Sequence, residues 1–193
     1  MTISKIKVAI GMSGGVDSSV AAYLLTESGY EVKGIFMKNW EEDDSDECSS
    51  KEDYEDAKRV CKHLGIKLNL VNFSDKYWTN VFETFINELK KGFTPNPDVF
   101  CNKEIKFKQY YDYAVSLNFD LIATGHYASK KNVTDPELHI PKDTLKDQTY
   151  FLYMMKQNVL RSHVLHLHYS ELFGEYLNLS LIHISEPTRR YAI

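Results

Sequence analysis

A chain of 193 residues with 43% apolar residues is long enough to bury one hydrophobic core, which predicts a single folded domain or little more. No stretch approaches the roughly 20 consecutive apolar residues that cross a bilayer, and the opening residues, MTISKIKVAI, lack the apolar run and cleavage site of a signal peptide. Three cysteines at unrelated spacings match neither a disulfide framework nor a zinc motif. We therefore expect a protein that stays in a reducing compartment.

The net charge of −4 conceals an uneven distribution of charge. Residues 41–56 hold ten acidic residues and one basic residue, whereas the rest of the chain holds 17 acidic and 22 basic residues. This excess of basic residues is compatible with a polyanionic partner such as nucleic acid. Each lysine taken singly is also compatible with an ordinary solvated surface.

Short apolar runs alternate with segments of helical periodicity along the first 125 residues. Four runs predict buried strands, at residues 7–11, 30–37, 67–73 and 120–125. Four helices are predicted between them, at residues 16–28, 49–64, 76–91 and 99–117. Gly29 ends the first helix, and Ser49 with Glu52 forms a candidate capping box for the second. The alternation predicts an α/β fold with a doubly wound, Rossmann-like parallel sheet.

The segment GMSGGVDSS, residues 11–19, follows the first predicted strand and opens the first predicted helix. Ligands of open α/β sheets bind beyond the carboxyl ends of the strands, which is where this segment lies. Gly14 and Gly15 allow a sharp turn and close approach to an anion, toward which the amides of the next helix point. Three hydroxyls add donors, those of Ser13, Ser18 and Ser19. We interpret the segment as a phosphate cradle, distinct from the Walker A and GxGxxG motifs; the alternative is a glycine turn in which Asp17 caps the helix.

The segment TPNPDVFCNKEIKF, residues 94–107, is the second candidate site. Asp98 can cap a helix there, which places Cys101 in the first turn, where the helix dipole stabilises a thiolate. Lys103 and Lys106 add positive potential, whereas Asp98 limits how far the thiol pKa falls. A reactive thiol beside a carboxylate that moves protons is one interpretation. The other is that Asp98 only caps the helix and Cys101 is a small apolar residue.

The remaining cysteines and histidines are weaker candidates. Cys61 shares an apolar helical face, which predicts a buried core thiol. Cys48 lies among carboxylates that disfavour a thiolate. His126 follows the fourth strand, and both a contact with nucleotide or RNA and a structural role remain open. Three later histidines lack the partners of a metal site: His163, His166 and His168.

The phosphate cradle and the segments after it resemble a known class of enzymes. SGGVDS after the first strand resembles the PP-loop of ATP pyrophosphatases, which adenylate a substrate oxygen and release pyrophosphate. That motif alone fits tRNA thiolation enzymes, tRNA lysidine synthetases, GMP synthetase and asparagine synthetase. Further segments narrow the resemblance to the tRNA-specific 2-thiouridylases over about residues 5–157: FMKNW (36–40), TPNPDVFCNKEIKF (94–107), ATGHYA (123–128) and KDQTYFL (146–152).

The resemblance implies a site for ATP with Mg²⁺ and a site for tRNA. The residues implied to hold the ATP phosphates are Gly11, Met12, Ser13, Gly14, Gly15, Val16, Asp17 and Ser18. Those implied to line the rest of the nucleotide site are Met37 and Gly125. Those implied to meet the target base are Asn96, Pro97 and Asp98, and those implied to contact tRNA are Lys146, Asp147 and Gln148. No metal site formed by the chain itself is implied.

The resemblance also implies a reaction. The C2 oxygen of the wobble uridine attacks the α-phosphate of ATP and releases pyrophosphate; a persulfide sulfur from a donor protein then displaces AMP. In the family a second, downstream cysteine carries the persulfide, and the residue matching Cys101 resolves it as a disulfide. An iron–sulfur cluster on the same cysteines stays open as another sulfur route. We expect a monomer without membrane attachment, in the cytoplasm of a bacterium or the mitochondrial matrix of a eukaryote.

The chain departs from the family pattern near its carboxyl end. We expect residues 1–157 to form the PP-loop catalytic domain and residues 158–193 to be an atypical, non-native tail, with the second cysteine and the central and β-barrel tRNA-binding domains absent. Two hypotheses follow: the catalytic domain of a tRNA uridine 2-sulfurtransferase, or a non-catalytic ATP-binding fragment. Lysidine synthesis is disfavoured because it does not need Cys101. Since only Cys101 matches a family cysteine, we expect the chain by itself not to complete sulfur transfer.

Overall fold

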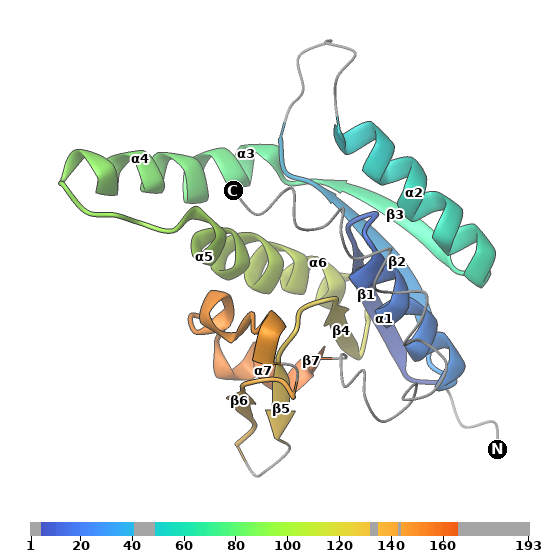
Figure 1. Ribbon diagram of the computed structural model, residues 1–193. Coiled ribbons are helices and arrows are strands. Elements are labelled where there is room, and N and C mark those ends of the chain that lie inside the picture. The colour runs from blue at the N-terminus through green and yellow to red at the C-terminus, as the bar shows by residue number, and fades with distance from the viewer. Residues whose placement is uncertain (1–4, 41–48, 132–134, 143, 166–193) are drawn as a thin grey trace.

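The computed structural model describes residues 5–40, 49–131, 135–142 and 144–165 (Figure 1). Its centre is a parallel sheet of five strands in the order β3-β2-β1-β4-β7. The strands are β1 (Lys7–Met12), β2 (Glu31–Lys38), β3 (Lys67–Asn72), β4 (Leu121–Thr124) and β7 (His163–Leu165). The order runs outward from β1 in both directions, which makes the gap between β1 and β4 the topological switch point. The predicted doubly wound α/β fold is confirmed.

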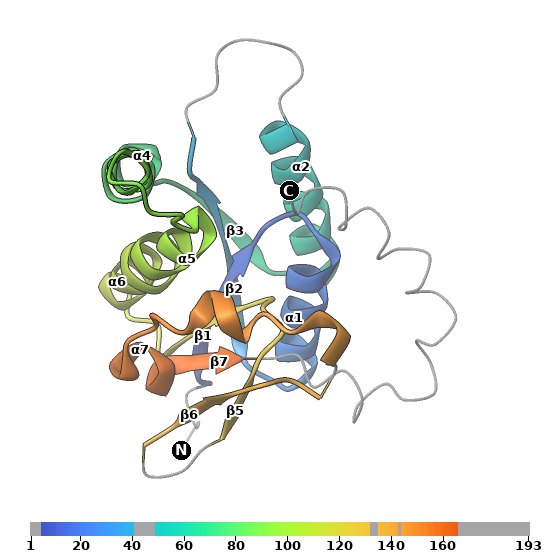
Figure 2. The same cartoon turned by 60° about the vertical axis from the view of Figure 1, so that its left-hand side comes forward.

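Helices cover both faces of the sheet. Figure 2 shows α1 (Val16–Glu27) and α2 (Ser49–Leu64) on one face. The helical segments on the other face are α3 (Ser74–Tyr77), η1 (Trp78–Phe82), α4 (Glu83–Lys90), α5 (Pro97–Cys101), η2 (Asn102–Gln109) and α6 (Tyr110–Ser116). Each face buries its own apolar cluster, and β1 contributes to both by alternation: Val8 and Ile10 pack toward α1 and α2, whereas Ala9 packs toward α6.

Tyr110 ties α6 to the switch point. Its side chain is fully buried, and its hydroxyl donates to the carbonyl of Ala9 on β1 at 2.7 Å and lies 3.3 Å from the carbonyl of Ala123 on β4. Burial raises the pKa of the Tyr110 hydroxyl, which therefore stays protonated as a donor. The Tyr110 hydroxyl therefore helps to fix β1 and β4 relative to each other, in addition to the backbone hydrogen bonds between the two strands.

Two long helices differ from their predicted form. The segment predicted at 76–91 spans α3, η1 and α4, and the segment predicted at 99–117 spans α5, η2 and α6, with η1 and η2 being π-helical. The second begins at Pro97 because the Asn96 side chain accepts from the amides of Asp98 (2.9 Å) and Val99 (3.4 Å). The expectation that Asp98 caps this helix is therefore wrong; Asn96 is the cap.

Several short elements after β4 were not expected from the sequence. They are the antiparallel hairpin β5 (Ser129–Lys131) and β6 (Glu137–His139), the 3₁₀ turns η3 (Thr144–Lys146) and η4 (Thr149–Leu152), α7 (Gln157–Ser162) and strand β7. Elements of three to six residues are too short to show a hydrophobic period. Both α7 and β7 include residues beyond 157, and the domain boundary there stays a prediction.

Some sequence interpretations concern residues outside the described ranges. Helix α2 begins at Ser49, but the Ser49 side chain, Cys48 and most of the acidic stretch lie outside them, so the candidate capping box of Ser49 and Glu52 stays a prediction. So do His166 and His168. Within the described residues, no helix has the length and apolar character that crossing a bilayer requires.

Candidate active site

The turn between β1 and α1 has a left-handed glycine at its start. Gly14 has φ +83°, and the amide of Gly15 donates to Ser13 Oγ at 3.3 Å. The hydroxyls of Ser18 and Ser19 donate to the Gly15 carbonyl at 3.1 and 2.8 Å, so they close the turn onto the helix. Gly15 is the N-cap and α1 has no side-chain cap, so the alternative in which Asp17 caps the helix is wrong. The first amides of α1 point out of the helix end as anion donors.

Glycines let three segments converge on this turn. A Cβ on Gly125, just after β4, would lie 2.6 Å from the Ser18 amide nitrogen at the start of α1. A Cβ on Gly11, at the end of β1, would lie 3.2 Å from Cε of Met37 on β2. The predicted phosphate cradle, residues 11–19, is called the phosphate loop from here on. The structure brings this loop, Met37 and Gly125 together at the switch point, as the sequence predicts. Their role in holding ATP stays a prediction.

Helix α2 also packs on the phosphate loop, which the sequence did not indicate. A Cβ on Gly14 would lie 2.4 Å from the carbonyl oxygen of Asp53 in α2, inside the closest normal approach. Burial raises the pKa of the Asp53 carboxyl, and the nearby carboxylates of Asp56 and Glu52 raise it further. The acidic amino-terminal part of α2 therefore borders the phosphate loop. Gly14 is needed for α2 to pack on the loop, whatever the loop binds.

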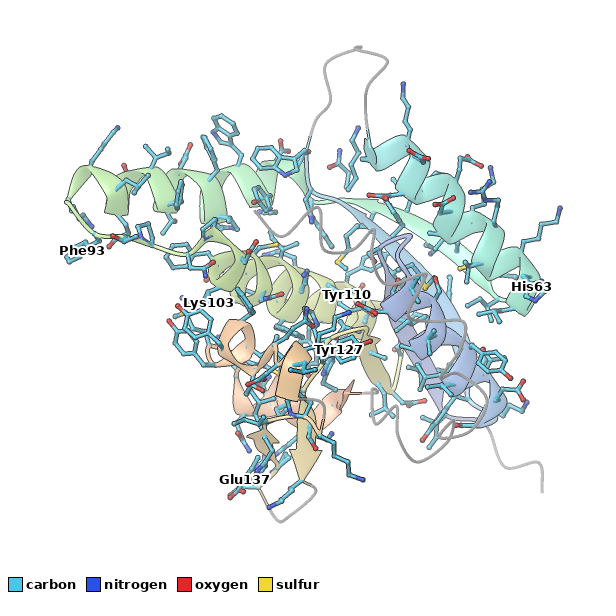
Figure 3. The ribbon with its side chains drawn as sticks, in the orientation of Figure 1. His63, Phe93, Lys103, Tyr110, Tyr127 and Glu137 are labelled. Atoms are coloured by element: carbon cyan, nitrogen blue, oxygen red, sulfur yellow. The ribbon has the colours of Figure 1, made fainter. Side chains whose placement is uncertain are left out.

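The segment predicted to contact tRNA is turned partly inward. Lys146 Nζ lies 2.9 Å from Asp17 Oδ2, and Gln148 exchanges hydrogen bonds with the backbone of Tyr127, accepting at Oε1 (2.9 Å) and donating from its amide (3.0 Å). Asp147 is exposed and accepts from the amide of Thr149 at 2.8 Å. Figure 3 shows Tyr127 near the middle of the molecule, whereas Phe93 and Glu137 lie at its periphery.

Cys101 lies beside Tyr77 and Asp98, but its thiol is not activated as the sequence suggested. Burial raises the pKa of Cys101 and the Asp98 carboxylate adds to that rise, while the ammonium of Lys106 opposes it. The expected fall in pKa is wrong, because burial outweighs the effect of the ammonium; Cys101 is also the fifth residue of its helix, beyond the first turn where the dipole acts. Burial raises the pKa of Tyr77 to about 12, and the neighbouring Cys101 and Asp98 also raise it.

Lys106 connects the thiol region to the end of β4 through a chain of polar contacts. Its Nζ lies 3.5 Å from His126 Nε2, His126 Nδ1 lies 2.8 Å from Thr124 Oγ1, and that hydroxyl lies 3.1 Å from His163 Nε2. Burial lowers the pKa of His126 well below its usual value, and Lys106 and His163 lower it further. His126 is thus a neutral, hydrogen-bonded side chain one residue after Gly125. A contact of His126 with nucleotide or RNA stays a prediction.

Cys61 and Cys101 lie in different layers. Cys61 is 2% exposed in the α1–α2 layer, as predicted, whereas Cys101 packs against the α6 layer and is partly exposed. Burial raises the pKa of Cys61 to about 11. Among the residues that the structure describes, no three His, Cys, Asp or Glu side chains gather as metal ligands.

We expect iodoacetamide to modify Cys101 faster than Cys61 at neutral pH. Both thiols have raised pKa values, so the difference comes from access to the reagent, and the nearby ammonium of Lys106 favours the Cys101 thiolate. Peptide mass spectrometry after timed labelling follows each cysteine separately. A Cys101→Ser variant controls for labelling elsewhere, and equal rates at the two sites would contradict the expectation.

The strand order, the glycine turn at the switch point and the glycine after β4 define a parallel α/β domain of the PP-loop type. The chain matches the family model of the tRNA methyl transferase HUP domain over residues 6–171, and it belongs to that family.

Curated relatives with similar sequences carry one name. The chain is 57% identical over 157 residues to tRNA-specific 2-thiouridylase MnmA of Aeromonas hydrophila, an alignment that covers 80% of this chain and 43% of the relative. It is 55% identical over 161 residues to the protein of that name in Lactobacillus gasseri, covering 82% of this chain and 43% of the relative. The chain thus spans about two fifths of the length of these relatives.

Among solved structures, the U34-tRNA thiolase NcsA of Methanococcus maripaludis, described with its [4Fe-4S] cluster, is 32% identical with a TM-score of 0.46. That match covers 64% of this chain and 39% of the other.

Proposed function

We propose that the chain is the adenylating part of an enzyme that uses ATP to 2-thiolate the wobble uridine of tRNA. The supporting observation is the link between the two candidate sites: Lys106, whose charge favours the Cys101 thiolate, reaches His126, and His126 follows Gly125, which packs on the phosphate loop. These contacts support a function in which nucleotide and thiol chemistry would meet near the carboxyl edge of one sheet. The names of the curated relatives support the same function.

The phosphate loop would bind the nucleotide. The amides that open α1 would stabilise the negative charge that develops when the uridine C2 oxygen attacks the α-phosphate and pyrophosphate leaves. Mg²⁺ usually keeps several of its waters and binds through substrate phosphates, so it would be held here mainly by the ATP phosphates. The bound ion would neutralise phosphate charge.

Cys101 and Asp98 would serve the second stage. Asp98 is exposed and beside Cys101, which suits a carboxylate that moves protons to or from the base. Cys101 rests as a thiol here, because burial raises its pKa. After the outer persulfide sulfur displaces AMP at C2, Cys101 would attack the inner sulfur of the carrier. The S–S bond would then break, Cys101 and the carrier would form a disulfide, and the outer sulfur would stay on the base. Asn96, which caps the helix carrying both residues, would fix their approach to the uridine.

Partners and location belong to the same proposal. The chain would act on tRNA with a persulfide donor protein as a monomer, in the cytoplasm of a bacterium or in the mitochondrial matrix of a eukaryote. Lys146, Asp147 and Gln148 would face the tRNA, with Asp147 the exposed member of the three.

Release of pyrophosphate from Mg-ATP tests the proposal. We expect the purified chain to release pyrophosphate when it is given unmodified tRNA with a wobble uridine. It should not do so with the same tRNA carrying cytidine at that position. Release with both RNAs would contradict the assignment of the target base. ATP binding without any release would instead support the non-catalytic ATP-binding fragment.

A further inference from the structure

The carboxylate of Asp17 is held by two side chains that are remote in the sequence. Lys146 Nζ donates to Asp17 Oδ2 at 2.9 Å, and the hydroxyl of Tyr127 donates to Asp17 Oδ1 at 3.1 Å. The ammonium of Lys146 also lies 4.1 Å from the centroid of the Tyr127 ring, at the range of a cation–π contact. Both carboxylate oxygens are therefore oriented by a cation and a hydroxyl from beyond β4.

The segment that carries Lys146 is anchored where it meets Tyr127. Gln148 binds the Tyr127 backbone through its side-chain oxygen (2.9 Å) and its amide (3.0 Å). The side chains of Lys146 and Asp17 are 33% and 26% exposed, so their attraction is screened less than that of a surface ion pair. This ion pair is thus a fixed feature of the loop environment.

The position of Asp17 creates an electrostatic conflict for an anionic ligand. Asp17 is the second residue of α1, where a carboxylate interacts favourably with the helix dipole. The same carboxylate lies beside the amides that would receive the ATP phosphates, and like charges at this range repel. A cation on Asp17 removes most of that repulsion.

We propose that Lys146 is a positioning residue of the nucleotide site, which acts by neutralising and orienting Asp17. This inference rests on the proposed function, because it takes the phosphate loop to bind ATP. Lys146 acts on the nucleotide through Asp17, and its effect on affinity therefore depends on the charge at residue 17. The segment proposed to face tRNA is by this route also part of the ATP site.

A double-mutant cycle read by calorimetry with Mg-ATP tests the inference. We expect Lys146→Met to weaken Mg-ATP binding about tenfold, in line with the loss of a hydrogen bond between charged groups. In the Asp17→Asn background the same substitution should change affinity less than twofold, because no charge remains to be neutralised. An equal loss in both backgrounds, or no loss in the wild-type background, would overturn the inference.

Three controls separate a specific effect of Lys146 on Asp17 from a general effect of charge and from a failure of nucleotide binding. Lys146→Arg keeps the cation and should restore affinity to within about threefold of wild type; affinity as low as that of Lys146→Met would count against the inference. Lys156→Met removes an exposed lysine from the same part of the chain and should bind like wild type; a tenfold loss there would show a non-specific charge effect.

If the wild-type chain binds no Mg-ATP, the proposed function fails and this inference with it. Wild-type binding that is unchanged in Lys146→Met overturns the inference alone.

Discussion

Replacing Gly14 by alanine will destabilise the chain by about 3 kcal/mol or more. Gly14 has φ +83°, where an L-residue costs roughly 1 to 2 kcal/mol. The added Cβ would also lie 2.4 Å from the carbonyl oxygen and 2.8 Å from the Cα of Asp53, which are backbone atoms that cannot rotate away. Helix α2 must therefore shift away from the phosphate loop. Urea unfolding monitored by circular dichroism gives the free energy of unfolding of both proteins.

Gly29 provides a matched control for this substitution. It also has φ +83°, but a Cβ there would meet no heavy atom within 4 Å. Gly29→Ala carries the backbone strain alone and should cost about 1 kcal/mol. The difference between the two variants isolates the contact with Asp53. Equal losses at the two glycines would show that α2 does not press on the loop.

The framework around the phosphate loop could be predicted from the sequence because its signals are local. Near-continuous apolar runs such as Lys7–Met12 are typical of strands buried on both faces, and the four predicted strands all lie in the sheet. The position of the loop beyond β1 followed from the fold alone. Gly11 and Gly125 come together for the same reason, since parallel strands end at one edge.

The contacts that shape the candidate site could not be predicted, because they join distant segments. The contact between Lys146 and Asp17 depends on how β4, the β5–β6 hairpin and η3 position the chain. The hairpin strands and η3 are too short to show a hydrophobic period in the sequence. Burial is likewise a property of the packed molecule. The thiol of Cys101 was expected to be activated by its helix and by lysines, yet desolvation outweighs both.

His163 is the clearest buried titratable group in this part of the fold. Its side chain is fully buried in β7, with Nε2 3.1 Å from Thr124 Oγ1, and burial lowers its pKa from 6.5 to about 3, with a further contribution from Lys130. Lys130 lies close because its Nζ donates to the His163 carbonyl at 2.7 Å. His126, on the other side of Thr124, also has a lowered pKa. A proton on His163 would therefore add positive charge to a buried site that already lies beside the ammonium of Lys130.

We expect His163 to make the protein about 2 kcal/mol less stable at pH 5 than at pH 7, beyond the loss from other groups. Its pKa is lower in the folded than in the unfolded chain, so its contribution to stability is complete above pH 6.5 and is lost as the pH falls toward 3. His163→Gln keeps a polar partner for Thr124 and does not titrate. Urea unfolding of both proteins at pH 7 and pH 5 gives two pH-dependent losses, and their difference removes the contribution of the shared carboxylates and of His126. The wild-type loss should be larger by about 2 kcal/mol; equal losses would mean that His163 is hydrated, or already protonated, in the folded protein.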